Sequence, residues 1–224
     1  MHRRSLLALI AASAALGASG ARAQDAPPPP ADLTAEDLLS GAPRALTAEE
    51  TQLINDISTH NSAITTMQGK FLQIDRSGGR IEGVFFLQRP DKIRFKYNPP
   101  SREEIISAGR GFYVLDRKEK KKTVYPQENV PLRQFLTDRI DLLNAGLIAI
   151  NNSPNYVALT LQDETPIGTV RVDLAFDRAS MDLVQWVLTD PQGTELTFSI
   201  YDVEKNIEIP RTYFYIDPTF TTSG

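Results

Sequence analysis

The feature that most constrains this fold is a series of short segments whose apolar residues recur at every second position. Residues 93–97, Ile-Arg-Phe-Lys-Tyr, alternate strictly, so a β-strand here would have one apolar face and one cationic face. Similar segments predict further strands over residues 67–75, 80–88, 103–108, 112–116, 121–125, 156–161, 170–176, 183–189, 195–203 and 213–216. Gly-, Pro- and Asn-rich turns separate many of them, as at 77–79, 89–91 and 98–100.

Short connections between successive strands favour an antiparallel arrangement. The sequence therefore predicts a mainly β fold with helices (α+β), built on one antiparallel sheet of about ten or eleven strands. A sheet of that size curls and does not lie flat. Its concave face would meet water unless helices cover it.

Two helical segments are available to cover that face. Thr47-Ala48-Glu49-Glu50 has the pattern of a capping box, and apolar residues follow at helical spacing, which predicts a helix over about 47–64. A second helical segment is expected from Pro131, which suits a first helical position. Its apolar face would be formed by Leu132, Phe135 and Leu136, and would continue through residues 140–143.

The N-terminal residues are typical of a secretory signal peptide. Arg3 and Arg4 precede an apolar run over residues 6–16, which is too short to span a bilayer, and Ala21-Arg22-Ala23 fits a signal peptidase site. We expect cleavage after Ala23 and export to an extracytoplasmic compartment, most simply a bacterial periplasm. The expected organisation is a signal peptide (1–23), a Pro-rich and largely disordered tether (24–46), one domain (47–218) and a tail (219–224).

Composition excludes several kinds of function. Removing residues 1–23 takes away three arginines and no acid, so the net charge falls from −4 to −7, which argues against nucleic acid as a partner. The chain has no Cys, and His60 is the one His left after cleavage. Thiol catalysis and Cys-based metal sites are therefore excluded, and no metal site or cofactor is expected. We read His60 as a polar residue near a helix end.

The sequence has more apolar residues than a one-sided sheet needs. Residues 81–87 and 71–74 place large apolar side chains on both faces of their predicted strands. Either both faces are simply covered by other parts of the chain, or the concave face encloses an apolar cavity for acyl chains. Burial of hydrocarbon would supply about 0.8 kcal/mol per CH₂ to such a cavity. Periodicity alone does not choose between the two interpretations.

The order of motifs in the first half resembles a known family. It begins with Gly-Lys-Phe-Leu-Gln at 69–73 and continues with Gly-Val-Phe-Phe-Leu-Gln-Arg-Pro-Asp-Lys-Ile-Arg-Phe-Lys-Tyr at 83–97. Ile-Ile-Ser-Ala-Gly at 105–109 and Tyr-Val-Leu-Asp at 113–116 follow, with weaker matches at 131–132, 186 and 213–218. This order is similar to the outer-membrane lipoprotein carrier protein family, LolA, over about residues 47–218.

The resemblance implies an incomplete antiparallel β-barrel closed by a helical lid, without a cofactor. It also implies a non-enzymatic periplasmic chaperone that binds the acyl chains of lipoproteins. Such a protein takes lipoproteins from an inner-membrane ABC releasing complex and passes them to an outer-membrane acceptor. We expect the chain to act as a monomer.

The resemblance also assigns site residues. Arg89 would hold the lid closed by hydrogen bonds to carbonyl groups, with Pro90 forcing its backbone to be extended. The lid's inner face would be formed by Leu132, Phe135 and Leu136. The candidate cavity wall consists of Phe71, Phe85, Leu87, Ile93, Phe95 and Tyr97. Ile93 departs from the family pattern, which has an aromatic residue at this position.

Two other functions remain open at this stage. The same fold could serve a related periplasmic carrier of lipid or glycolipid, or an envelope sensor that binds a membrane signalling protein. A small hydrolase would need His60 or converging carboxylates such as Asp138 and Asp141. A cleaved signal without a Cys for lipid attachment favours a diffusing shuttle over an anchored receptor.

Overall fold

In the residues that the structure describes, the fold is one large open sheet with one α-helix packed against it. It was analysed as a computed structural model, which describes residues 45–109, 111–126, 130, 133–165 and 168–222. The predicted signal peptide and almost all of the predicted tether lie outside the described residues. Within them, no helix is both long and apolar enough to cross a membrane.

The described residues form one α-helix, two 3₁₀ helices and twelve strands. The helices are α3 (Ala48–Ser62), η3 (Arg133–Leu136) and η4 (Arg211–Phe214). The strands are β1 (Thr66–Asp75), β2 (Arg80–Gln88), β3 (Lys92–Tyr97), β4 (Glu103–Ala108), β5 (Gly111–Asp116), β6 (Lys121–Pro126), β7 (Leu147–Asn152), β8 (Tyr156–Thr165), β9 (Gly168–Asp177), β10 (Leu183–Thr189), β11 (Glu195–Lys205) and β12 (Thr221–Thr222).

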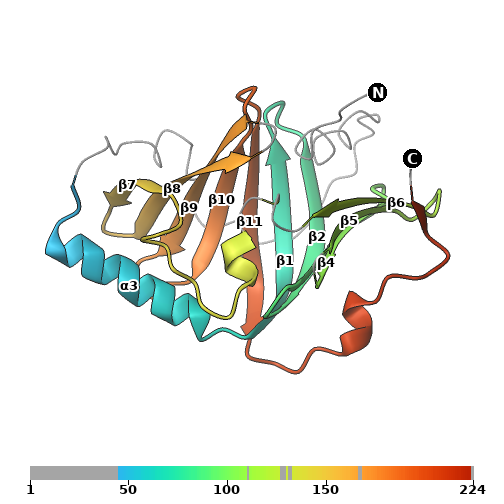
Figure 1. Cartoon of the computed structure of the whole chain (residues 1–224), viewed down its shortest axis with the longest axis horizontal. Helices are drawn as coiled ribbons and strands as arrows, with labels where there is room; N and C mark the ends of the chain where they lie inside the picture. Colours follow the sequence, from blue (N-terminus) through green and yellow to red (C-terminus); the bar gives the residue numbers. More distant parts are fainter. Residues whose placement is uncertain (1–44, 110, 127–129, 131–132, 166–167, 223–224) are drawn as a thin grey trace.

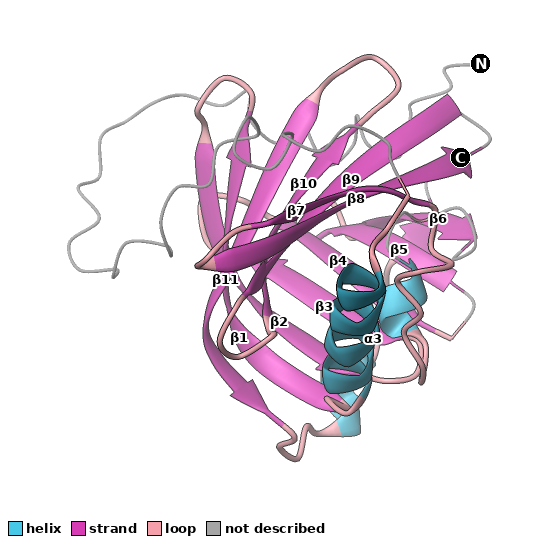
Figure 2. Cartoon of the chain, turned by 90° about the vertical axis from the view of Figure 1, so that its left-hand side faces the viewer, coloured by secondary structure: helices cyan, strands magenta, loops and turns pink. Residues whose placement is uncertain are grey.

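The strands form one sheet in the order β12-β6-β5-β4-β3-β2-β1-β11-β10-β9-β8-β7. All neighbours are antiparallel except β12, whose two residues run parallel to β6. The long β1–β11 pairing joins the two halves of the chain, with Phe71 opposite Ile200. The sheet curves around its concave side without closing into a barrel (Figures 1 and 2). The predicted mainly β fold on one curved sheet is therefore confirmed.

Helix α3 covers part of the concave face, as the sequence predicted (Figure 2). Its capping box is formed in both directions: the Glu50 N–H donates to Thr47 Oγ1 at 3.1 Å, and the Thr47 N–H donates to Glu50 Oε2 at 2.9 Å. Ile54 and Ile57 are fully buried and join the cluster of apolar residues on the inner face of the sheet. The apolar stripe of the helix is therefore stabilised by tertiary packing.

The second predicted helix is mostly wrong. Only Arg133–Leu136 is helical, as the short 3₁₀ turn η3, and residues 131–132 lie outside the described residues. Downstream, the N–H of Ile140 donates to Ser62 Oγ at 2.9 Å and the N–H of Leu142 donates to Ser58 Oγ at 3.3 Å. These amides bond to hydroxyls of α3 and not to carbonyls one turn back, so the segment is an irregular strap along the helix.

The predicted strand at 213–216 is also wrong, because residues 211–214 form η4 after Pro210. This segment crosses the outer face of the sheet: Phe214 is buried, and the ring of Tyr213 lies 4.6 Å from that of Phe86. Strand β7 was not predicted, because Leu-Ile-Ala-Ile at 147–150 shows no alternation. The two-residue strand β12 is too short to be predicted from alternation of apolar and polar residues.

A glycine on β2 leaves room for an aromatic ring on the neighbouring strand β1. Gly83 on β2 lies opposite Phe71 on β1. A Cβ atom at Gly83 would lie 2.5 Å from the Phe71 ring and 2.4 Å from the carbonyl oxygen of Lys96. Phe71 in turn makes edge-to-face contacts with Phe95 and Tyr97, with ring centroids 5.2 and 5.0 Å apart. Gly83 therefore makes the space on which this aromatic cluster depends.

We predict that Gly83→Ala destabilises the protein by about 1–3 kcal/mol, because the methyl group overpacks the site. Urea unfolding followed by tryptophan fluorescence measures this change. Phe71→Leu in the Gly83→Ala background should recover part of the loss, since it removes the ring that the methyl group meets. A Gly83→Ala variant as stable as the wild type would contradict this account of the packing.

Candidate functional site

An apolar cavity lies between the sheet and the segments that cover its concave side. It has a volume of about 370 Å³. Strands from both halves of the sheet contribute to its wall, and the strap and the end of α3 close it. The lining residues are Asn61, Ile64, Met67, Phe85, Leu87, Arg89, Ile93, Phe95, Ile105, Phe112, Val130, Phe135, Leu136, Asp182, Leu183, Val184, Trp186, Leu188, Phe198, Ile200, Asp202, Val203 and Lys205.

Most of the expected site residues line this cavity. They are Phe85, Leu87, Arg89, Ile93, Phe95, Phe135 and Leu136. The inner face of β2 is therefore the one that carries Phe85 and Leu87, while Phe86 points to the outer face, where it contacts Tyr213. The side chains of Phe135 and Leu136 are buried where the strap meets the cavity.

Three of the expected residues lie elsewhere, and a fourth is not described. Phe71 and Tyr97 do not line the cavity; both are buried beside it, and the Tyr97 hydroxyl donates to Gln73 Oε1 at 2.6 Å. Burial raises the pKa of the Tyr97 hydroxyl well above its usual range. Pro90 is exposed, and Leu132 lies outside the described residues. Phe71 and Tyr97 thus act as packing beneath the wall.

Sequence reasoning missed the wall contributed by the second half of the sheet. Trp186 on β10 stacks on Phe198 of β11, with ring centroids 5.1 Å apart and ring planes 10° apart. Phe95 reaches the same pair at 6.3 Å from each ring. Both residues stand on strands that the sequence predicted, but only the β1–β11 pairing brings them opposite Phe95.

Arg89 connects the end of β2 to both covering segments. Its Nε donates to the Phe135 carbonyl of η3 at 2.9 Å, and its Nη1 donates to the Ile64 carbonyl, just beyond α3. The backbone nearby adds two contacts: the Arg89 N–H donates to Thr65 O at 2.8 Å and the Asp91 N–H to Leu136 O at 2.7 Å. One planar guanidinium therefore bridges the helix end, the strap and the sheet.

The surroundings of Arg89 disfavour its charge. Burial lowers the pKa of its guanidinium to about 10 from the usual 12.5. Its two bonds from the side chain go to neutral carbonyl groups, which do not compensate a buried charge as a carboxylate would. In this arrangement the Arg89 guanidinium is partly desolvated, which is unfavourable, and its two hydrogen bonds to carbonyl groups offset that cost.

A second polar cluster lies at the other side of the same helix end. His60 Nε2 lies 2.7 Å from Asp182 Oδ1, and Lys205 Nζ lies 2.7 Å from Asp182 Oδ2. Burial tends to raise the pKa of Asp182, but hydrogen bonds from Lys205 and His60 outweigh it, so the net pKa lies below its ordinary 3.8. His60 is thus a paired helix-end residue, and its bond to Asp182 leaves that nitrogen unavailable to activate a hydroxyl.

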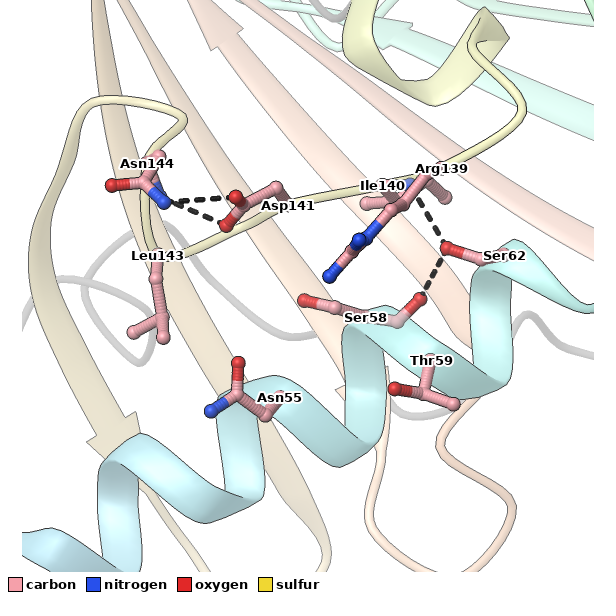
Figure 3. A pocket seen from close by; sticks show the side chains of 9 residues that line it. All are labelled: Asn55, Ser58, Thr59, Ser62, Arg139, Ile140, Asp141, Leu143 and Asn144. Atoms are coloured by element: carbon pink, nitrogen blue, oxygen red, sulfur yellow. Dashed lines mark hydrogen bonds between the residues drawn. The ribbon is translucent and has the colours of Figure 1, made fainter.

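A separate hollow of about 440 Å³ lies on the outer side of α3, against the strap. Figure 3 shows its polar lining, in which Ser58 and Ser62 of α3 face the strap residues 139–144. The two hydroxyls already donate to helix carbonyls and accept from strap amides. Asp141 is likewise bonded to Asn144 at 2.8 Å. These polar groups satisfy one another, so we read the hollow as the seam between helix and strap.

Within the described ranges, no three or more His, Asp or Glu side chains converge in a way that could hold a metal ion. Asp141, half of the carboxylate pair considered for hydrolysis, bonds to Asn144 on the outer side of α3, away from the apolar cavity. The arrangement of this site therefore suits binding of an apolar ligand by burial.

Comparison with known proteins agrees with this geometry. A family model described as outer membrane lipoprotein carrier protein LolA matches residues 62–217, well over half of the chain. The chain belongs to the LolA family. The description of this family is that of a carrier protein for outer-membrane lipoproteins.

Two curated relatives of this LolA-family protein are named outer-membrane lipoprotein carrier protein. The one from Alkalilimnicola ehrlichii is 35% identical over 75 residues, which cover 31% of this chain and 35% of the relative. The one from Halorhodospira halophila is 30% identical over 128 residues, covering 53% of this chain and 61% of the relative. The matches thus span less than two thirds of either relative.

Solved structures are similar at a lower level. A LolA superfamily protein from Nitrosomonas europaea aligns over 77% of this chain and 99% of its own, with 11% identity and a TM-score of 0.41. The MucA/MucB complex of Pseudomonas aeruginosa aligns over 78% of this chain and 63% of its own, with 12% identity and a TM-score of 0.44. Likeness at this level carries no conclusion about function.

We predict that Asp182 contributes stability that disappears in acid. Its pKa is lower in the folded chain than in the unfolded chain, so the contribution is complete above an unfolded pKa of about 3.9 and is lost as pH falls through the folded value. The measurement is the difference in free energy of unfolding between wild type and Asp182→Asn at pH 5, 4 and 3.

The difference should shrink towards zero as pH drops below about 4. The control is Glu119→Gln, which removes an exposed carboxylate 3.2 Å from Lys121 at a hairpin tip. It should change the free energy of unfolding by less than about 0.5 kcal/mol at each pH. A difference for Asp182→Asn that grows on acidification would show that the sign is wrong.

Proposed function

We propose that this protein is a periplasmic lipoprotein carrier that holds acyl chains in the cavity between its curved sheet and its lid. The lid is defined as helix α3 together with the strap, residues 133–144. The observation that carries the proposal is an apolar cavity whose two covering segments are held by one arginine, Arg89, at its rim. Membership of a carrier family supports the same function.

We infer that the structure represents the closed state of the cavity. Its volume of about 370 Å³ is near the lower end of the range of about 300–1,000 Å³ for small-molecule sites. Phe135 and Leu136 occupy the space next to the wall. Displacement of these side chains by an acyl chain would enlarge the cavity while keeping the wall covered.

Cargo and lid therefore compete for the same apolar surface. Each buried CH₂ group contributes about 0.8 kcal/mol, and the lid offers a comparable apolar cover when cargo is absent. The net affinity is the difference between the two, so cargo can be passed on. Arg89 biases this competition towards the closed state, and its release restores water to a poorly solvated guanidinium.

The route of the cargo follows from the family and from the N-terminus. Residues 1–23 would direct export and be removed after Ala23, leaving a diffusing monomer in the periplasm. The carrier would receive lipoproteins from an inner-membrane ABC releasing complex and deliver them to an outer-membrane acceptor. Binding suffices for this role, and we assign no enzymatic activity.

Arg89→Leu should load acylated lipoprotein but release it poorly. Without the two side-chain hydrogen bonds, the closed lid competes less well with cargo, by about 1–3 kcal/mol. The measurement is transfer of a purified radiolabelled lipoprotein from the carrier to outer-membrane vesicles. Arg80→Leu is the matched control, because Arg80 is exposed at the opposite end of the same strand, β2.

Transfer by Arg89→Leu at the rate of wild type and Arg80→Leu would refute the role of Arg89. That result would not contradict the proposal that the cavity binds acyl chains, because an apolar side chain at position 89 adds no charge to the cavity wall.

The identity of the cargo is tested by native mass spectrometry of the protein isolated from periplasm. Acylated polypeptides bound one to one are the expected result, because a carrier of lipoproteins binds its cargo through acyl chains. Free phospholipid or glycolipid as the sole ligand would replace the lipoprotein assignment by that of a lipid carrier. Recovery of a membrane signalling protein without acyl groups would instead indicate an envelope sensor.

A further inference from the structure

We propose that Asp182, with His60 and Lys205, forms a second latch that holds the C-terminal turn of helix α3 closed over the cavity. This inference rests on the proposed function, because it concerns the regulation of the same lid. Nothing in the family resemblance assigns a role to these three residues. They are hereafter called the acidic latch.

The geometry joins the lid to the sheet at one carboxylate. Asp182 directly precedes β10, just after the turn that follows β9, and Lys205 ends β11. Lys205 Nζ contacts both carboxylate oxygens of Asp182, at 2.9 and 2.7 Å. His60, on α3, contacts Oδ1 at 2.7 Å across 122 positions of sequence. Because an ionised carboxylate only accepts, His60 Nε2 must carry the hydrogen of this bond.

A neighbouring contact holds the same turn of the helix. Asn61 Nδ2 donates to the Met181 carbonyl at 2.8 Å, beside Asp182. Asn61 is buried, and it also donates to the Ile57 carbonyl within the helix at 2.9 Å. The helix end is therefore bonded to the β9–β10 turn through two consecutive residues.

Arg89 and the acidic latch hold opposite sides of the same helix end. Arg89 bonds to the Ile64 carbonyl from the end of β2, whereas Asp182 bonds to His60 from just before β10. The cavity lies between them, and Asn61, Ile64, Arg89, Asp182 and Lys205 all line it. An acyl chain that enters beneath this end of α3 must separate the helix from both sides.

The acidic latch is built to open without leaving a buried charge unpaired. Removing one partner of a buried ion pair is strongly destabilising. Here Asp182 keeps Lys205 when His60 departs, because both belong to the sheet and not to the lid. About a third of each of the His60 and Lys205 side chains is exposed, so water reaches the cluster on opening. At the acidic latch itself, opening therefore breaks the His60–Asp182 hydrogen bond, and the neighbouring Asn61–Met181 bond is lost with it. Closing restores both.

The absence of Cys from the chain allows a direct measurement of opening. A single thiol is introduced by Ile105→Cys, which lines the cavity on β4. A second, separate variant, Val172→Cys, places the thiol in the buried core of β9, away from the cavity. The labelling rate with a small thiol reagent reports lid opening for the first and global unfolding for the second.

Asp182→Asn should raise the labelling rate of the Ile105→Cys protein about tenfold, as expected when a charge-assisted hydrogen bond becomes a weaker, neutral one. The Val172→Cys protein should show a much smaller change. His60→Ala should behave like Asp182→Asn, whereas His60→Gln keeps a donor and should stay near wild type. Glu119→Gln, the matched removal of a carboxylate far from the lid, should leave both rates unchanged.

Combined variants test whether the latches are separate. His60→Ala should add little to Asp182→Asn, because both act on the same His60–Asp182 contact. Arg89→Leu and Asp182→Asn should multiply in their effect on the labelling rate. Unchanged labelling of the Ile105→Cys protein by Asp182→Asn would overturn the proposal, as would an equal increase for the Val172→Cys protein.

This outcome is independent of cargo, because the assay contains no lipoprotein. If the labelling results hold and wild type fails to transfer lipoproteins, the lipoprotein assignment fails and the latch stands as the gate of an apolar cavity. If transfer succeeds and labelling is unchanged, the carrier function stands and the acidic latch is wrong.

Discussion

An open sheet cannot cover its own concave face, and this constraint organises the molecule. The twelve strands of the described residues curl enough to enclose a volume but do not close, so the apolar inner surface needs a cover from elsewhere in the chain. Helix α3 and the strap supply that cover. A cover made of segments that are not hydrogen-bonded into the sheet can leave it without breaking strand pairing, which is what a reversible binding site requires.

The polar contacts of the cover differ in kind from its apolar packing. Apolar contacts are non-directional, and a cargo of hydrocarbon can replace them. Hydrogen bonds are directional, so Arg89 and the Asp182 cluster define where the lid closes. Both lie at one end of α3, and in the proposed mechanism this is the end that would open. The middle of the helix is anchored by the buried Ile54 and Ile57 side chains.

The helix and the strap are also joined to one another. Ser58 and Ser62, one turn apart on α3, accept hydrogen bonds from the strap amides of Leu142 and Ile140. Arg89 then reaches a carbonyl group of each segment. Because one guanidinium bonds to both, its release would, in the proposed mechanism, loosen both parts of the lid in one step.

Local sequence patterns determined much of this fold. The alternation at 93–97 and the capping box at Thr47 each depend on neighbours in the chain, and both have the predicted structure. The cavity residues Phe85, Leu87 and Phe95 were also accessible, because a strand's period places them on one face once that face is known. Arg89 could be singled out through the family resemblance.

Only the tertiary structure decided which side chains meet. Phe71 and Tyr97 share the inner face with Phe95, yet they pack beneath the wall, because neighbouring rings and Gly83 set the depth of each side chain. The predicted helix over most of the strap does not form, because amides of the strap donate hydrogen bonds to hydroxyl groups on α3. His60 and Asp182 are 122 positions apart in the sequence, and they come into contact only because the strand order of the sheet places β10 near the end of α3. Period and capping act between near neighbours, whereas a contact between distant residues exists only once the sheet has assembled.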